Sequence, residues 1–180
     1  LCDFAHANGL RVHVDGARYA NACAALDVPL NALAGAAGVD VLAFGGTKNG
    51  LLGGEAVIVF DPALAERAAY ARKQATQLAS KMRFVAAQFV AYLEADLWRE
   101  LAAHANHMAA RLAAALAHTD GIAFVVPVAC NMLFPRLPRP AIERDLQTPV
   151  AGVDHRIDRV LAHAIEGVQR RDVRPDQLGC

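Results

Sequence analysis

Three short apolar runs near the start of the chain have the length and composition of β-strands. They cover residues 10–14, 39–44 and 56–60, and glycine or Asp-Pro turn signals bound them. The first run leads into Asp15, and the second leads into a Gly-Gly-Thr stretch that ends at Lys48. The pattern therefore predicts buried strands with these two polar residues where strands stop.

The pattern changes to that of helices between residues 62 and 117. This section is rich in alanine, and its apolar residues recur at spacings of three and four, which predicts roughly three helices. The runs 122–126 and 131–137 then predict two more strands, as in the start of a smaller α+β subdomain. Residues 153–168 predict one amphipathic helix, but the absence of aromatic residues after position 134 argues against a packed core there.

The order of these elements indicates the fold class. Strands that end in polar loops and are joined by crossovers point to an α/β layered domain with a predominantly parallel sheet. In such a sheet, ligands bind beyond the carboxyl ends of the strands.

Composition and charge exclude several classes of function. Eighteen basic and eighteen acidic residues cancel, so we expect no binding to nucleic acid or to an anionic membrane. No apolar run approaches the roughly 20 residues of a membrane helix. The four cysteines show no paired spacing, which favours reduced thiols in a cytoplasmic protein.

Lys48 stands out because only three of the eighteen basic residues are lysines, the others being Lys73 and Lys81. An amine forms a Schiff base with an aldehyde and a guanidinium does not, so a chain that otherwise uses arginine has a chemical reason to keep lysine here. The alternative is an ordinary solvated loop lysine.

Asp15 is the second candidate. A carboxylate at the end of a buried strand is costly unless it has a charged or hydrogen-bonding partner, and a protonated pyridine ring would be one. The alternatives are that Asp15 caps the turn formed by residues 16–18 or pairs with Arg18.

The segments around both candidates resemble the threonine aldolase family of pyridoxal-phosphate enzymes. Residues 13–22 read HVDGARYANA and match the family's H-x-D-G-A-R-x-x-N-A segment. Residues 44–56 read FGGTKNGLLGGEA and are similar to the Schiff-base segment of its bacterial low-specificity branch. Residues 72–84 are similar to the family's next helix, in which a Met-Arg pair, here Met82-Arg83, presents its arginine to the cofactor phosphate. The resemblance runs from Leu1 to about Leu137.

This resemblance implies a lyase that uses pyridoxal 5'-phosphate to cleave β-hydroxy-α-amino acids such as L-threonine or L-allo-threonine to glycine and an aldehyde. Lys48 and Asp15 would be the catalytic and cofactor-binding pair, with Lys48 forming the Schiff base and Asp15 keeping the ring nitrogen cationic. Arg18 would bind near the cofactor's phenolic oxygen and the substrate carboxylate. Arg83 would face the phosphate, and Thr47 would either reach the phosphate or cap a helix.

The resemblance also implies the fold and the assembly. The fold would be the type I fold of pyridoxal-phosphate enzymes, an α/β large domain with a mainly parallel sheet, followed by part of a small α+β C-terminal subdomain. Residues 1–100 would be the C-terminal part of the large domain, 101–137 the start of the small subdomain, and 138–180 a divergent tail. The intact protein is expected to form a homo-oligomer, a dimer or a tetramer.

The chain is expected to be a fragment, because the family's phosphate-binding glycines and ring-stacking histidine come from sequence that precedes the segment matched by Leu1. Two alternatives stay open. The chain is a catalytically inactive truncated or frame-shifted remnant, or it belongs to another pyridoxal-phosphate-dependent beta-eliminating lyase. The DGAR and GGTKNGL wording favours the aldolase branch.

The helix pattern carries one further candidate site. His104 and His107 stand three residues apart, but no carboxylate or cysteine motif accompanies them, so no metal site is expected. Trp98 is expected to pack in the core or at a subunit interface.

Overall fold

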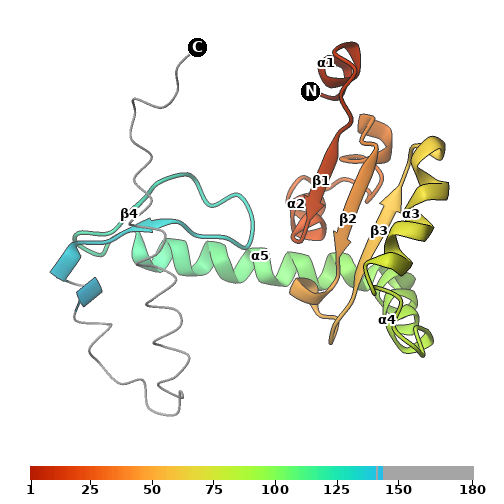
Figure 1. Ribbon diagram of the computed structural model, residues 1–180. Coiled ribbons are helices and arrows are strands. Elements are labelled where there is room, and N and C mark those ends of the chain that lie inside the picture. The colour runs from red at the N-terminus through yellow and green to blue at the C-terminus, as the bar shows by residue number, and fades with distance from the viewer. Residues whose placement is uncertain (141, 144–180) are drawn as a thin grey trace. The chain divides into compact units, whose positions relative to one another are not determined.

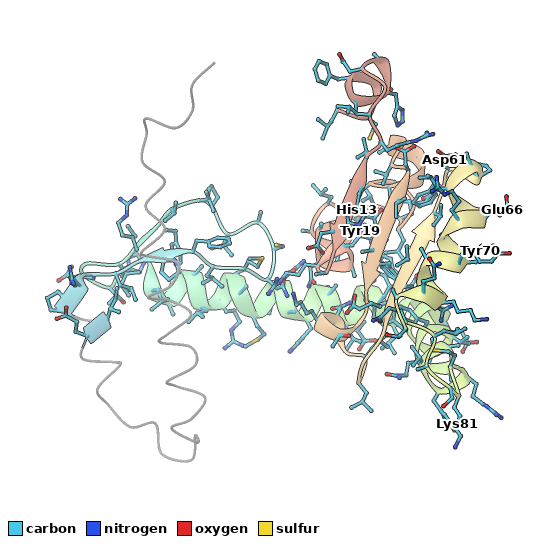
Figure 2. The ribbon with its side chains drawn as sticks, viewed as in Figure 1. His13, Tyr19, Asp61, Glu66, Tyr70 and Lys81 are labelled. Atoms are coloured by element: carbon cyan, nitrogen blue, oxygen red, sulfur yellow. The ribbon has the colours of Figure 1, made fainter. Side chains whose placement is uncertain are left out.

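A computed structural model describes residues 1–140, 142 and 143, which divide into two compact units. The first unit comprises Leu1–His118 and Phe124–Phe134, and it holds the main sheet and all the α-helices given below (Figure 1). The described part of the second comprises Thr119–Ala123 and the residues from Pro135 onward. The helix predicted at 153–168 and most of the predicted tail lie outside the described residues.

The first unit alternates strands and helices in the order expected for an α/β domain. Its elements are α1 (Cys2–Ala7), β1 (His13–Gly16), α2 (Tyr19–Ala25), the 3-10 turn η1 (Gly35–Ala37), β2 (Val41–Gly45), the 3-10 turn η2 (Thr47–Asn49), β3 (Glu55–Val59), α3 (Pro62–Gln74), α4 (Arg83–Leu93), the 3-10 turn η3 (Glu94–Asp96) and α5 (Leu97–Leu116). The three predicted strands and the three predicted helices are confirmed. The α/β fold class is confirmed with them.

The sheet has the order β1-β2-β3. β1 and β2 run parallel, with Asp15 opposite Ala43, whereas β2 and β3 run antiparallel. The antiparallel pair differs from a purely parallel sheet because residues 46–54 are too short a connection for a crossover, which needs a dozen or more residues. The described sheet is therefore mixed, and its parallel half carries the predicted site.

The core of this unit lies between the sheet and the helices α2, α4 and α5. An aromatic cluster forms its centre, in which the Tyr19 ring meets the Phe44 ring edge-on at 6.0 Å and Tyr92 lies 6.1 Å from Phe44. Trp98 belongs to the same core with 3% of its surface exposed, so its predicted core position is confirmed. In Figure 1, α3 runs beside β3 while α5 runs across the strand direction.

One expectation about the strands is wrong. β1 is not buried along its length, because His13 and Asp15 are exposed and only Gly16 is buried. β1 is an edge strand of the described sheet, so one side of it has no neighbouring strand within the described residues.

The two strands predicted after α5 are much shorter than the apolar runs suggested. β4 (Ala123–Phe124) and β5 (Pro135–Arg136) have two residues each and form a separate two-stranded sheet. Proline lacks the N–H that a strand ladder needs, and Pro127, Pro135 and Pro138 interrupt this region.

Candidate active site at the ends of β1 and β2

The parallel pairing of β1 and β2 brings the two main candidates to one edge of the sheet. Asp15 lies opposite Ala43, near the end of both strands, and Lys48 follows the last residue of β2 by three positions. Parallel strands place their carboxyl ends at the same edge. Asp15 and the turn that carries Lys48 therefore lie at the carboxyl ends of two adjacent strands.

Lys48 is the exposed middle residue of the turn η2. The surrounding loop is closed at its base, where the Gly46 N–H donates to the Gly54 carbonyl at 3.1 Å. Exposure of the amine fits both the Schiff-base role and the alternative of a solvated loop lysine.

Thr47 reinforces that loop. Its hydroxyl accepts from the Gly54 N–H at 3.0 Å and lies 3.2 Å from the Gly54 carbonyl, to which it donates. The hydroxyl makes no capping bond to η2, so the helix-capping alternative is wrong. The predicted contact with a phosphate stays a prediction.

Asp15 takes the local hydrogen bond that the alternative interpretation foresaw. Its Oδ1 accepts from the Ala17 N–H at 3.0 Å, which fixes the turn that follows β1. It forms no ion pair with Arg18 among the described residues. The argument from a buried carboxylate does not hold, because Asp15 is exposed at a sheet edge, but this exposure leaves the carboxylate accessible to a ligand.

Arg18 lies at the position that precedes α2 and is half-buried. Its Nε is fully buried and has no hydrogen-bond partner within the described residues. A buried donor without a partner costs on the order of 1–3 kcal/mol, and more when the group is charged. The guanidinium of Arg18, three residues after Asp15, thus has an N–H that could donate to a further acceptor.

The structure does not bring Arg83 to the other candidates. Arg83 is the exposed first residue of α4. That helix reaches the Lys48 loop further along, where Gln88 bonds both backbone groups of Gly53 at 3.3 Å. Five residues separate Arg83 from Gln88, or about 7.5 Å along the helix axis. The phosphate role of Arg83 stays a prediction.

Sequence reasoning missed two residues behind the Lys48 turn. Asn49 is buried, and its side-chain amide donates to the Tyr92 hydroxyl and to the Trp98 carbonyl. The Asn49-Gly50 pair is a turn signal in the sequence, and no local pattern shows that its amide is buried. The aromatic positions of α4 predicted core packing but gave no partner for the Tyr92 hydroxyl.

An apolar cavity in the described part of the chain lies away from these residues. It has a volume of about 360 Å³, lies on the sheet face between α2 and α4, and neither Asp15 nor Lys48 lines it. Its walls come from core residues such as Leu42, Phe44 and Phe89. The candidate site is instead an exposed edge.

Other classes of site have little support in the described part of the chain. No group of three or more potential metal ligands is found there, and His104 and His107 are exposed on α5. No helix among residues 1–140 is long and apolar enough to cross a membrane. Cys2, Cys23 and Cys130 are free thiols.

Comparisons with known proteins find relatives of this chain. The sequence profile described as beta-eliminating lyase matches residues 1–137. Low-specificity L-threonine aldolases from Pseudomonas aeruginosa and from Pseudomonas sp. strain NCIMB 10558 are 51% and 49% identical over 135 residues, which are 75% of this chain. The chain spans only 39% of the length of either relative. A solved structure of threonine aldolase from Leishmania major is similar with a TM-score of 0.72 and 28% identity, over 93% of this chain and 54% of that one.

Proposed function

The chain belongs to the beta-eliminating lyase family, and from this premise we propose that the intact protein is a pyridoxal-phosphate-dependent low-specificity threonine aldolase. It would cleave β-hydroxy-α-amino acids such as L-threonine or L-allo-threonine to glycine and an aldehyde. The observation that carries this proposal is that Asp15 and the turn bearing Lys48 lie at the carboxyl ends of the adjacent parallel strands β1 and β2.

The donor set at this edge fits pyridoxal 5'-phosphate. An exposed amine suits its aldehyde, an exposed carboxylate suits its protonated ring nitrogen, and the guanidinium of Arg18 suits an anionic oxygen. The Arg18 Nε has no hydrogen-bond partner among the described residues, and this supports a ligand there, because a bound acceptor would remove the cost of the buried donor. When bound, the cofactor supplies an electron sink for the charge left at Cα.

Each residue has a distinct task in this proposal. The Lys48 amine binds the cofactor and afterwards displaces the product. Asp15 holds the proton on the ring nitrogen, because an adjacent ionised carboxylate favours the cationic form. Arg18 orients the substrate carboxylate, for which its planar and permanently charged group is suited. Thr47 and Arg83 are proposed to contact the phosphate.

The wider assignments are also proposals. The intact protein would be a cytoplasmic homo-oligomer, a dimer or a tetramer, that acts on a small amino-acid substrate. Residues 1–100 would belong to the cofactor-binding large domain, 101–137 to the small subdomain and 138–180 to a divergent tail. Within the described residues α5 continues across position 100 and packs on α2, and the compact units divide after His118. The proposed domain boundary at residue 100 therefore falls within α5.

Covalent trapping tests the proposal. Purified chain is mixed with pyridoxal phosphate, reduced with borohydride, and the adduct is mapped by peptide mass spectrometry. We expect the adduct on Lys48, with Lys73 and Lys81 as internal controls on exposed surfaces. Lys48→Arg keeps the positive charge but cannot form the Schiff base, so it should abolish the specific adduct as Lys48→Ala does.

The same experiment separates the alternatives. Labelling spread evenly over the three lysines, with no aldehyde released from threonine, would support the catalytically inactive remnant. A Lys48 adduct together with pyruvate and ammonia from tyrosine or tryptophan would instead support another beta-eliminating lyase. Acetaldehyde and glycine from threonine, measured on the intact protein, are the expected products.

A further inference from the structure

The turn that carries Lys48 is fastened to the core by the next residue. Asn49 is only 5% exposed, and its Nδ2 donates to the Tyr92 hydroxyl at 2.5 Å and to the Trp98 carbonyl at 3.0 Å. Both hydrogens of the amide are therefore used. The turn within the nine-residue loop between β2 and β3 is thus bonded to the core by this side chain, in addition to the bonds that Thr47 and Gln88 make at Gly53 and Gly54.

The chemistry of the partners fixes the orientation of this amide. The Trp98 carbonyl only accepts, so the nitrogen and not the oxygen of Asn49 must face it. Burial raises the pKa of Tyr92, so its hydroxyl stays neutral and offers lone pairs to the same nitrogen. A rotated amide would place two oxygens against each other.

Both partners of the Asn49 amide are buried. Tyr92 is 1% exposed in the aromatic core, and Trp98 is 3% exposed at the start of α5. The Trp98 indole N–H donates to Asp96 at 3.0 Å, a local bond between the end of η3 and the start of α5. The two hydrogen bonds of the Asn49 amide, called the Asn49 clamp below, therefore join the Lys48 turn to α4 and α5.

The residue after Asn49 adds a second constraint. Gly50 has φ of +107°, and a Cβ built on it would lie 2.6 Å from Leu101 Cδ1 of α5. Its backbone thus lies against the Leu101 side chain of α5, and its positive φ favours glycine at this position. The peptide unit that follows Lys48 is consequently fixed by Asn49 on the inside and by the contact of Gly50 with α5.

From these contacts we propose that Asn49 is a positioning residue for Lys48. A lysine side chain has four flexible bonds, so the place of its amine depends on a fixed Cα. The buried amide fixes that Cα relative to the end of β2, next to Asp15. Small displacements of a reacting group cost orders of magnitude in rate, so a loose turn would lower the capture of an aldehyde by Lys48. This inference rests on the proposed function.

The test compares Asn49→Ala with a matched variant elsewhere. Asn21 is also a fully buried asparagine whose side chain bridges two elements, since its Nδ2 donates to Asn106 Oδ1 at 3.3 Å between α2 and α5. Asn21→Ala therefore removes a comparable buried amide far along the chain from the Lys48 loop. Tyr92→Phe is a milder variant, because it keeps the ring and removes only one acceptor of the Asn49 amide.

Amide hydrogen exchange reads the clamp without any cofactor. In Asn49→Ala we expect exchange in residues 46–54 to become at least about tenfold faster, while β1 keeps its rate. Tyr92→Phe should give a smaller increase in the same segment, and it keeps the test decisive if Asn49→Ala does not fold. Unchanged exchange in 46–54 in the folded variants overturns the clamp.

Labelling with pyridoxal phosphate and borohydride then measures how well Lys48 is positioned to capture the aldehyde. We expect the share of adduct on Lys48, relative to Lys73 and Lys81, to fall about tenfold in Asn49→Ala and to stay unchanged in Asn21→Ala. An unchanged share in Asn49→Ala, or an equal fall in Asn21→Ala, shows a merely structural role and overturns the inference while the proposed function stands. Even labelling of the wild-type chain contradicts the proposed function itself, and the positioning role falls with it.

Discussion

Gly16, the residue after Asp15, lies opposite Phe44 of β2 with no room for a side chain, and replacing it with alanine should destabilise the ends of these strands. An added Cβ would lie 2.5 Å from the Ala43 carbonyl oxygen, 2.7 Å from Leu42 Cδ1 and 3.2 Å from Tyr19 Cβ. The first of these atoms is backbone in the strand opposite, so it cannot move without disturbing the parallel ladder. The φ angle of Gly16 is not in the left-handed region, so the cost is a contact and not a backbone preference.

The magnitude follows from the kind of atom contacted. Overpacking a folded core costs about 1–3 kcal/mol, and a backbone oxygen with no room to yield places Gly16→Ala near about 3 kcal/mol. With a urea slope of about 2 kcal/mol per molar, the unfolding midpoint should fall by about 1.5 M. The loss is large beside a typical total stability of about 5–15 kcal/mol.

The assay is urea unfolding followed by the fluorescence of Trp98, the single tryptophan, which is 3% exposed. Gly53→Ala is the matched control, because nothing lies within 4 Å of its built Cβ and its φ is not positive. That variant should change stability by less than about 0.5 kcal/mol or stabilise slightly. Equal stability losses in the two variants would refute the reasoning from the close contact of Gly16.

Two further predictions concern pH and rest on the shifted pKa values of Asp40 and Tyr19. The hydrogen bond from the Val12 N–H, and to a lesser extent the one with His6, lowers the pKa of Asp40 in the folded chain. The ionised carboxylate therefore stabilises the fold at pH values above the ordinary pKa of an aspartate. This stability is lost as the pH falls through the lowered pKa of the folded state. In acid unfolding, Asp40→Asn should be less stable than wild type near neutral pH, and the difference should vanish at the most acid pH; a constant difference would contradict this. Burial raises the pKa of Tyr19 to about 12, so alkaline pH between about 10 and 12 should favour unfolding. Phenolate absorbance in the Tyr70→Phe variant should stay low across that window until the chain unfolds, and early ionisation would count against it.

Much of the fold was predictable from local pattern. The apolar runs gave β1, β2 and β3 to within a few residues, and the spacings of three and four gave the helices from 62 to 117. These signals act over one strand or one helical turn, so they survive without tertiary information. The apolar runs predicted longer strands than β4 and β5, because the prolines in this region interrupt the hydrogen-bond ladder that a longer strand needs.

The site was predictable in its chemistry and less so in its surroundings. The rarity of lysine made Lys48 a candidate and the predicted strand end made Asp15 one, while the resemblance to the threonine aldolase family supplied their proposed roles. The pattern gave the wrong environment for Asp15, since edge position and exposure depend on which strands become neighbours. The antiparallel direction of β3 likewise depends on its pairing with β2, because the loop that carries Lys48 is too short for a parallel crossover.

The sequence by itself determined which residue types stand at the ends of β1 and β2, and hence the family resemblance on which the proposed cofactor rests. Only the tertiary structure decided that the Arg18 Nε is buried without a partner among the described residues, and that Asn49 bonds Tyr92 and Trp98. The reason is physical: periodicity and turn preference arise between near neighbours. Burial of a polar atom depends instead on groups more than forty residues away, which meet it only when the core has packed.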